Sequence, residues 1–280
     1  IPGDAAVQRS LGALYLWPVT PEPQRPMAIQ TAERSSAQDA SENPIYQRHM
    51  AAYLAAVPYM KGSVLELGCG EGYGMALLAK HCDQYLGVDK HPVPNLHIPP
   101  QARVMQATFP PLGGINSNQF DAVVTFQVIE HLEDDQAFLK EIHRVLKPGG
   151  VLLLTTPNRL MSLTRNPWHV REYDPTSMKQ LLESVFGRVD LQGVFGNSVV
   201  MEYYEQNKAS VQKLTRWDFL NLQHRLPRRW LQVPYDLANR LNRRNLRQAN
   251  TGLVSRIRSE DYPIAPLSDR ALDYFALCYK

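Results

Sequence analysis

The stretch E-L-G-C-G-E-G-Y-G, residues 66–74, decides the fold of this chain. It continues an apolar segment, 63–67 (SVLEL), that we expect to form a buried strand, and it opens a segment with helical character, 73–81. Glycines at such a junction let the backbone adopt positive φ and approach a ligand closely. The order of strand, glycine-rich turn and helix therefore predicts a loop that binds a nucleotide-like ligand.

The spacing of these glycines argues against a nicotinamide or flavin dinucleotide. The fingerprint of that class, G-x-G-x-x-G/A, needs a small residue at its last position. When the fingerprint is counted from Gly68, its last position is Tyr73, and when it is counted from Gly70, its last position is Met75. Both side chains are too large for the close packing of helix on strand that the fingerprint requires. A purely structural turn stays open as an alternative, although four glycines in seven residues disfavour it.

Asp89 ends the next predicted strand, 85–89 (YLGVD), 21 residues after Gly68. A carboxylate at this place can accept hydrogen bonds from both ribose hydroxyls of an adenosine. Taken alone, Asp89 could equally be a turn or helix-capping residue. Together with the glycine loop, it is predicted to bind a ribose.

Strands and helices alternate in the rest of the chain, which implies a mostly parallel sheet with helices on both faces. The pair Gly149-Gly150 is expected to end a helix and turn the chain into a strand. Further strands are expected at 103–107, 120–126, 151–155 and 189–195, and helices at 44–60, 134–146 and 174–185.

Composition divides the chain into four parts. They are an irregular arm rich in Pro, Ser, Gln and Ala (1–44), an α/β core (45–196), a basic helical insertion or lid (197–265), and a segment that returns to the core sheet as its final strand (266–280).

Five motifs in this order resemble those of class I, Rossmann-like S-adenosylmethionine-dependent methyltransferases, among them ubiquinone-pathway and sugar or small-molecule enzymes. The motifs are residues 66–74, Gly87-Val88-Asp89, Phe120-Asp121-Ala122-Val123, Ile129-Glu130-His131-Leu132 and Leu146-Lys147-Pro148-Gly149-Gly150. The resemblance implies a seven-stranded sheet whose last strand, here 270–279, is antiparallel. It also implies S-adenosyl-L-methionine as the cofactor.

The resemblance also implies a set of cofactor contacts. Gly68 and Gly70 would contact the methionine part through their backbone, and Asp89 would hold the ribose. Thr108 stands where members of the family often have an adenine-binding Asp, so adenine recognition would depend on its hydroxyl, on backbone atoms or on a neighbouring ring. The complete predicted set is Glu66, Gly68, Cys69, Gly70, Gly72, Tyr73, Asp89, Lys90, Ala107, Thr108, Phe109 and Gln127.

Catalysis of methyl transfer consists mainly of positioning the acceptor and removing its proton. His131 is the candidate general base, because an imidazole can take a proton near neutral pH. Glu130 and His169 complete the predicted catalytic group, and a structural or capping role for the Glu130-His131 pair stays open.

A divalent metal held by Glu130, His131 and His169 is the alternative role for this group. Glu-His pairs here resemble those of ubiquinone-pathway O-methyltransferases and of small-RNA terminal ribose methyltransferases. The RNA enzymes add a second glutamate where this chain has Gln127, and the loss of one carboxylate weakens a site for a hard cation. We therefore predict no metal.

Residues 206–258 carry twelve Lys or Arg against two Asp, in a chain of net charge +3. Within them the segment 224–247 has an interrupted apolar stripe flanked by arginines. It could pack on its own domain, lie on an anionic membrane, or face a phosphorylated or lipid-linked acceptor. Nucleic acid is not favoured, since no nucleic-acid-binding module is visible.

Hydropathy, the first thirty residues and the cysteines bear on the cellular compartment of the chain. No apolar run reaches the roughly 18–20 residues that span a bilayer, and residues 1–30 do not resemble a signal peptide. Three scattered cysteines favour a reducing, cytoplasmic compartment. Residues 33–34, Arg48-His49 and Tyr53 resemble a segment that closes over the cofactor in small-molecule methyltransferases, with surface decoration as the alternative.

We therefore expect an enzyme that moves a methyl group to an O or N atom of a small-molecule acceptor, such as a sugar, a lipid-linked glycan or a quinone-like compound. The alternatives are an RNA ribose 2′-O-methyltransferase and a non-catalytic module that only binds S-adenosylmethionine.

Overall fold

The computed structural model describes residues 42–280 apart from 94–97, 217, 219–221 and 250. Most of the predicted arm, including residues 33–34, lies outside the described residues. The described part begins where the chain enters its first helix, α1 (Asn43–Ala56).

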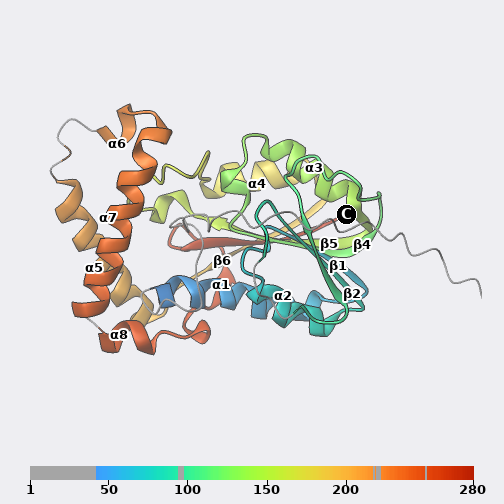
Figure 1. Ribbon diagram of the computed structural model, residues 1–280, viewed down its shortest axis with the longest axis horizontal. Coiled ribbons are helices and arrows are strands. Elements are labelled where there is room, and N and C mark those ends of the chain that lie inside the picture. The colour runs from blue at the N-terminus through green and yellow to red at the C-terminus, as the bar shows by residue number, and fades with distance from the viewer. Residues whose placement is uncertain (1–41, 94–97, 217, 219–221, 250) are drawn as a thin grey trace, which may run out of the picture. The chain divides into compact units, whose positions relative to one another are not determined.

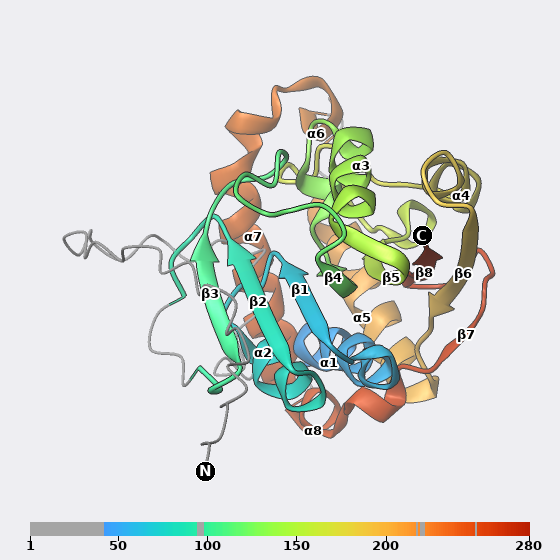
Figure 2. The same cartoon turned by 90° about the vertical axis from the view of Figure 1, so that its right-hand side faces the viewer.

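One eight-stranded sheet organises the molecule, in the order β3-β2-β1-β4-β5-β8-β6-β7 (Figure 2). The strands are β1 (Ser63–Leu67), β2 (Gln84–Asp89), β3 (Ala102–Gln106), β4 (Phe120–Phe126), β5 (Leu146–Pro157), β6 (Arg188–Val194), β7 (Ile264–Pro266) and β8 (Asp273–Tyr279). Strands β3, β2, β1, β4 and β5 pair in parallel, whereas β8 pairs antiparallel with both β5 and β6. The predicted Rossmann-like sheet with an antiparallel last strand is confirmed. The additional strand, β7, is a three-residue edge strand that overlaps the end of the predicted insertion.

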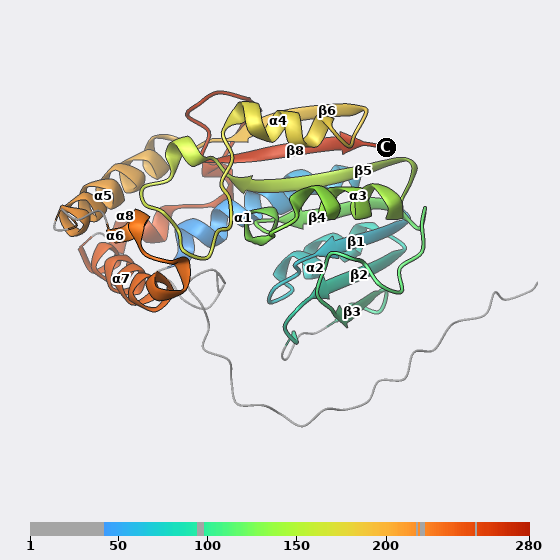
Figure 3. The same ribbon diagram turned by 90° about the horizontal axis from the view of Figure 1, so that it is seen from above.

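Helices cover both faces of this sheet, with α1 and α2 on one face and α3 and α4 on the other (Figures 2 and 3). The helices after α1 are α2 (Tyr73–Leu78), α3 (Asp135–Val145), α4 (Pro175–Glu183), α5 (Ser198–Thr215), α6 (Leu222–Arg225), α7 (Arg228–Ala249) and α8 (Thr251–Arg256). Short 3-10 turns are η2 (Val57–Tyr59), η3 (Ala79–His81), η4 (Ile129–His131), η5 (Arg159–Met161) and η6 (Ser259–Asp261).

The central strands are apolar on both faces because helices cover both. Along β1, Val64 packs into the cluster under α1 and α2, while Leu65 and Leu67 pack into the cluster under α3 and α4. All three side chains are fully buried. A strand buried in this way lacks the polar alternation of a half-exposed strand, which is why the sequence SVLEL was readable as a core strand.

The role predicted for Gly149-Gly150 is wrong in detail. Helix α3 already ends at Val145, and β5 begins at Leu146, which pairs with Phe120. The register then shifts, and Gly149 adopts a φ of 77°. A Cβ atom on Gly150 would lie 2.9 Å from the Lys147 carbonyl oxygen. The two glycines therefore allow an irregularity inside β5, whereas the helix stops because Leu146 turns into extended backbone.

The basic insertion forms helices α5 to α8, and α5, α7 and α8 gather beyond one end of the sheet (Figures 1 and 3). The cavity described below shows that this is the carboxyl end of the parallel strands, since residues after β4 and β5 face residues of α5 and α7 across it. Among the described residues, none of the helices has the length and apolar character that crossing a membrane requires.

Candidate active site

The glycine loop joins β1 to α2 and turns on three residues with positive φ. Gly68, Gly70 and Gly72 have φ values of 81°, 55° and 79°, a region that side chains disfavour. Gly68 also packs closely, because a Cβ atom there would lie 2.4 Å from a Val128 methyl group. By contrast, a Cβ atom on Gly70 would meet nothing within 4 Å. The loop is thus packed at its base and open above Gly70.

Glu66 supports this loop from below. Its buried carboxylate accepts hydrogen bonds from Tyr53 (2.6 Å) and Tyr85 (2.7 Å). Burial raises the pKa of the Glu66 carboxyl, and the two phenolic hydrogen bonds act in the opposite direction. Because Tyr53 belongs to α1, this triad fixes that helix to the base of the loop. Direct contact between Glu66 and a cofactor stays a prediction.

Asp89 lies at the end of β2, next to the loop. One carboxylate oxygen accepts a hydrogen bond from the Gly70 amide (2.9 Å), and the other accepts one from the His91 amide (2.8 Å). A carboxylate oxygen can accept more than one hydrogen bond. Asp89 thus lies beside the glycine loop, its ribose role stays a prediction, and Lys90 follows it on the surface.

The predicted adenine-side residues follow β3. The Ala107 amide donates to the Asp89 carbonyl oxygen (2.9 Å), which holds the two strand ends together. Thr108 is exposed, and the ring of Phe109 stacks on Phe138 with 5.4 Å between centroids. The structure thus places these residues beside Asp89, at the same edge of the sheet.

Gln127 follows β4 with a φ of 57°, which is uncommon for a residue with a side chain. Its amide donates to the Thr155 carbonyl oxygen (2.9 Å) and its side-chain nitrogen to the Thr155 hydroxyl (3.3 Å). Such strained backbone clusters at functional sites. Here it ends the strand abruptly and directs the chain into the turn that carries Glu130 and His131.

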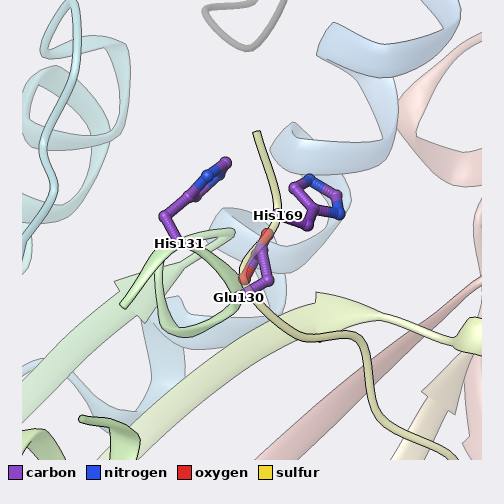
Figure 4. Close-up of side chains that lie close together, drawn as sticks. All are labelled: Glu130, His131 and His169. Atoms are coloured by element: carbon purple, nitrogen blue, oxygen red, sulfur yellow. The ribbon is translucent and has the colours of Figure 1, made fainter. Parts of the chain in front are cut away.

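Glu130, His131 and His169 are brought together, although 38 residues separate the last two in sequence (Figure 4). Each contributes one nitrogen or oxygen atom to a group whose members all lie within 4.8 Å of one another. The two imidazole rings meet edge to face at 5.0 Å. Glu130 is buried, and its carboxylate accepts a hydrogen bond from the Thr156 hydroxyl (2.9 Å) at the end of β5.

The hydrogen bonds of the two histidines differ. His131 Nδ1 lies 3.2 Å from the Trp168 carbonyl oxygen. Because a carbonyl oxygen only accepts, Nδ1 carries the hydrogen, and Nε2 is the basic nitrogen of the neutral ring. His169 instead has Glu172 on Nδ1 (2.6 Å) and the side-chain amide of Asn166 near Nε2 (2.8 Å). His131 thus has Nε2 as its basic nitrogen and stays the candidate base, while Glu172 and Asn166 contact both nitrogens of His169.

A cavity of about 280 Å³ opens beside these residues. Polar groups from distant parts of the chain line it, and helices of the insertion form one wall. Residues from α1, the β4 and β5 ends, α5 and α7 include Arg48, His131, Asn158, Tyr203, Asn207 and Asn239.

Sequence reasoning missed Asp273, at the start of β8. Its buried carboxylate lies 3.1 Å from Nε of Arg48, which lines the cavity. Burial raises the pKa of Asp273 to about 6, while the Arg48 charge acts in the opposite direction. The final strand reads as apolar core, so no local signal distinguishes this carboxylate from a turn residue. The only sequence feature that pointed to this part of the site was the Arg48-His49 pair, which was predicted to belong to a segment that closes over the cofactor.

The chain is similar in sequence to a known family and to several known proteins. Residues 65–154 match the family model described as a methyltransferase domain. A probable S-adenosylmethionine-dependent methyltransferase of Mycolicibacterium smegmatis is 30% identical over 256 residues, covering 87% of this chain and 90% of that protein. A protein of the same description from Mycobacterium tuberculosis is 37% identical over 175 residues, covering 59% and 64%.

Other similarities extend over a shorter part of the chain or have a lower sequence identity. The ubiquinone biosynthesis O-methyltransferase of Pseudomonas paraeruginosa is 29% identical over 104 residues, which is 35% of this chain and 45% of that enzyme. Among solved structures, the [4+2]-cyclase SpnF has a TM-score of 0.52 at 15% identity, covering 91% of this chain and 88% of that chain. This last similarity shows the fold alone.

Proposed function

The chain belongs to the S-adenosylmethionine-dependent methyltransferases, and from this premise we propose that it methylates a hydroxyl oxygen of a polar small molecule, a sugar or a lipid-linked glycan. The observation that carries the proposal is the pairing of an oriented base, His131, with a cavity lined by hydroxyl, amide and charged groups.

The loop residues fit the cofactor. The open space above Gly70 leaves room for a ligand against the backbone, and the Asp89 carboxylate lies next to that space through its bond to the Gly70 amide. Gly68 and Gly70 would hold the methionine part, Asp89 the ribose, and Thr108 with Phe109 the adenine. When bound, S-adenosylmethionine supplies a methyl group that its positive sulfur already activates.

His131 would accept the proton of the acceptor hydroxyl at Nε2. The Trp168 carbonyl holds Nδ1–H, so the ring keeps one orientation and one tautomer. Glu130 lies beside the ring, buried and bonded to Thr156, where its carboxylate can stabilise the imidazolium that forms. A base of this kind contributes about 10²–10⁴-fold to a rate.

A polar acceptor is supported by the lining of the cavity. Tyrosine hydroxyls and asparagine amides can both donate and accept hydrogen bonds, as recognition of a polyhydroxylated ring requires. Arg48 of α1 and Arg243 of α7, each paired with a carboxylate, add further hydrogen-bond donors to the lining. A quinone-like acceptor would leave more of these groups without a partner, which costs binding energy.

The test is a panel of sugars, glycolipids, quinols, amines and RNA ends, with formation of S-adenosylhomocysteine, the product left after the methyl group is transferred, as the readout. The wild-type chain is expected to turn over a hydroxylated sugar. His131→Asn should lower kcat by about 10²-fold or more, with S-adenosylmethionine affinity retained. The matched control is His81→Ala, because His81 is exposed and lies in η3, at the other end of α2 from the glycine loop.

Two results would contradict the proposal. Turnover of RNA ends but of no small molecule would favour the ribose methyltransferase alternative. Tight cofactor binding with no acceptor in any class would favour the non-catalytic module.

A further inference from the structure

Helix α7 carries large apolar side chains on its outer surface. Trp230, Val233, Leu237 and Leu241 are 72%, 77%, 61% and 51% exposed. Their spacing of three and four residues puts them on one face of the helix. Single exposed apolar residues are ordinary on protein surfaces, but a continuous stripe of four marks an interaction site.

The inner surface of the same helix is mixed: Leu246 is buried, and polar side chains beside it make directed contacts. Asp236 accepts a hydrogen bond from the Trp168 indole (2.9 Å), and the Asn242 amide donates to the Asn207 side chain (2.8 Å). Arg243 lies 3.4 Å from Glu42. Hydrogen bonds and an ion pair thus contribute much of the attachment of α7 to the rest of the protein. The apolar stripe is not needed for that attachment.

The exposed positions of α7 also carry arginines. Arg229, Arg240, Arg244 and Arg247 are exposed, whereas the one acidic residue of the helix, Asp236, is partly buried and bonded to Trp168. We propose that this outer face of α7, with its apolar stripe and flanking arginines, docks on an anionic lipid membrane.

Charge and side-chain composition both favour a membrane as the occupant. An interfacial helix buries its apolar side chains at the boundary between headgroups and acyl chains, while arginines beside them reach anionic headgroups. Tryptophan prefers this boundary, and the Trp230 side chain is largely open to solvent at the start of the stripe. The combination of an inserted aromatic ring, aliphatic side chains and cations therefore matches a charged lipid surface.

Docking would bring the cavity close to the lipid surface. Tyr235, Asn239 and Arg243 of α7 line the cavity, whereas the apolar stripe lies on exposed positions of the same helix, so a single helix separates the two. A helix with its side chains is about 10 Å wide. Delivery of a lipid-linked acceptor by this route rests on the proposed function, whereas the docking itself does not.

The test is co-sedimentation of the full chain with vesicles of phosphatidylcholine, with and without phosphatidylglycerol at about a third of the lipid, a content that gives the surface a negative potential. Binding is expected to the anionic vesicles and to weaken with salt. Trp230→Ser with Leu237→Ser should reduce the partition coefficient at least about tenfold, since both side chains would insert. Replacing Arg229, Arg244 and Arg247 by Gln should reduce it by about fivefold per residue.

The matched control variants remove an apolar side chain or a cation at positions outside α7. Leu54→Ser removes an apolar side chain that is 45% exposed on α1, and Lys179→Gln removes an exposed cation on α4. Both should bind vesicles as the wild type does. Thermal unfolding of every variant checks that the chain is folded, and no cofactor or acceptor is required, so failure here is distinct from failure of the proposed function.

Three outcomes would overturn the docking proposal. The wild-type chain could fail to bind anionic vesicles, or the α7 variants could bind as well as the controls. Alternatively, light scattering could show a dimer that the Trp230→Ser, Leu237→Ser variant converts to a monomer, with no vesicle binding by either. That result would assign the stripe to a second copy of the chain.

Discussion

The proposed donor side, around the glycine loop, and the proposed acceptor side, around the cavity, are built in different ways. The donor side is a continuous run of chain: β1, the glycine loop, β2 and Asp89 lie within 27 residues, and backbone conformation sets most of its geometry. The acceptor side is assembled from α1, the ends of β4 and β5, the segment around His169, α5 and α7. The geometry of the acceptor side is set by side chains rather than by backbone amides.

This difference explains what each side can tolerate. Positive φ at Gly68 and close packing on Val128 leave little choice of residue on the donor side. The acceptor cavity can change its chemistry by changing single side chains on helices of the insertion, without altering the sheet.

The largest effect should come from Gly68→Ala, which breaks the donor side. The new Cβ atom would meet Val128 at 2.4 Å on a backbone with positive φ. Strain and overpacking should together cost about 2–6 kcal/mol, divided between stability and cofactor affinity. Thermal unfolding and calorimetric titration with S-adenosylmethionine measure both. Gly113→Ala is the control, because nothing lies within 4 Å of its Cβ position. Equal behaviour of the two variants would refute the packing argument.

On the acceptor side, Asp273→Asn should change how stability depends on pH. Burial raises the pKa of Asp273 to about 6, above the value of about 3.9 for an unfolded chain. The folded protein therefore binds this proton more tightly, so the contribution of Asp273 to stability is present below about pH 4 and is lost as pH rises through about 6.

That loss is on the order of 2–3 kcal/mol, since one pKa unit corresponds to about 1.4 kcal/mol. Urea unfolding at several pH values between about 4 and 7 compares the variant with the wild type, and the difference isolates Asp273 from other titrating groups. The gap in unfolding free energy should move in favour of the variant as pH rises. A constant gap would show that Asp273 titrates normally.

A smaller effect is expected from Asp89→Ala on the donor side. Loss of a buried hydrogen-bonding carboxylate should weaken S-adenosylmethionine binding by about 1–3 kcal/mol. Titration calorimetry measures the affinity, and Asp83→Ala, an exposed carboxylate before β2, serves as the control. Unchanged affinity of the Asp89 variant would remove its ribose role.

The smallest expected effect concerns the Glu130, His131 and His169 group. We expect dialysis against EDTA to leave the methylation rate unchanged, because this group offers only one carboxylate and hard divalent cations prefer several oxygen ligands. A rate that falls on dialysis and returns with Mg²⁺ or Mn²⁺ would instead assign a metal to these three side chains, which lie within reach of one another.

Much of the donor side was predictable because its signals are local. The strands 63–67 and 120–126 were predicted with the bounds that they have, and the helix after the glycine loop begins at Tyr73 as expected. Each of these elements has a short apolar run beside a glycine or a charged turn. The exception is Gly149-Gly150. These glycines lie at an irregularity inside β5, whereas the sequence predicted that they end a helix.

The acceptor side resists prediction because its contacts are remote in sequence. Arg48 and Asp273 are 225 residues apart, and the Trp168 carbonyl that orients His131 belongs to a loop with no apolar period. The pattern of α7 was visible as an interrupted apolar stripe with arginines. Which face packs inward could not be inferred, since polar residues rather than the stripe make these internal contacts.

The most direct test of this division is one pair of measurements on His131→Ala: calorimetric affinity for S-adenosylmethionine and turnover of the acceptor found in the panel. We predict an affinity within about twofold of the wild type, because our proposal assigns cofactor binding to the loop and Asp89, and turnover lower by about 10²-fold or more. Turnover at the wild-type rate, or an affinity that falls in step with turnover, would contradict the separation of donor and acceptor sides.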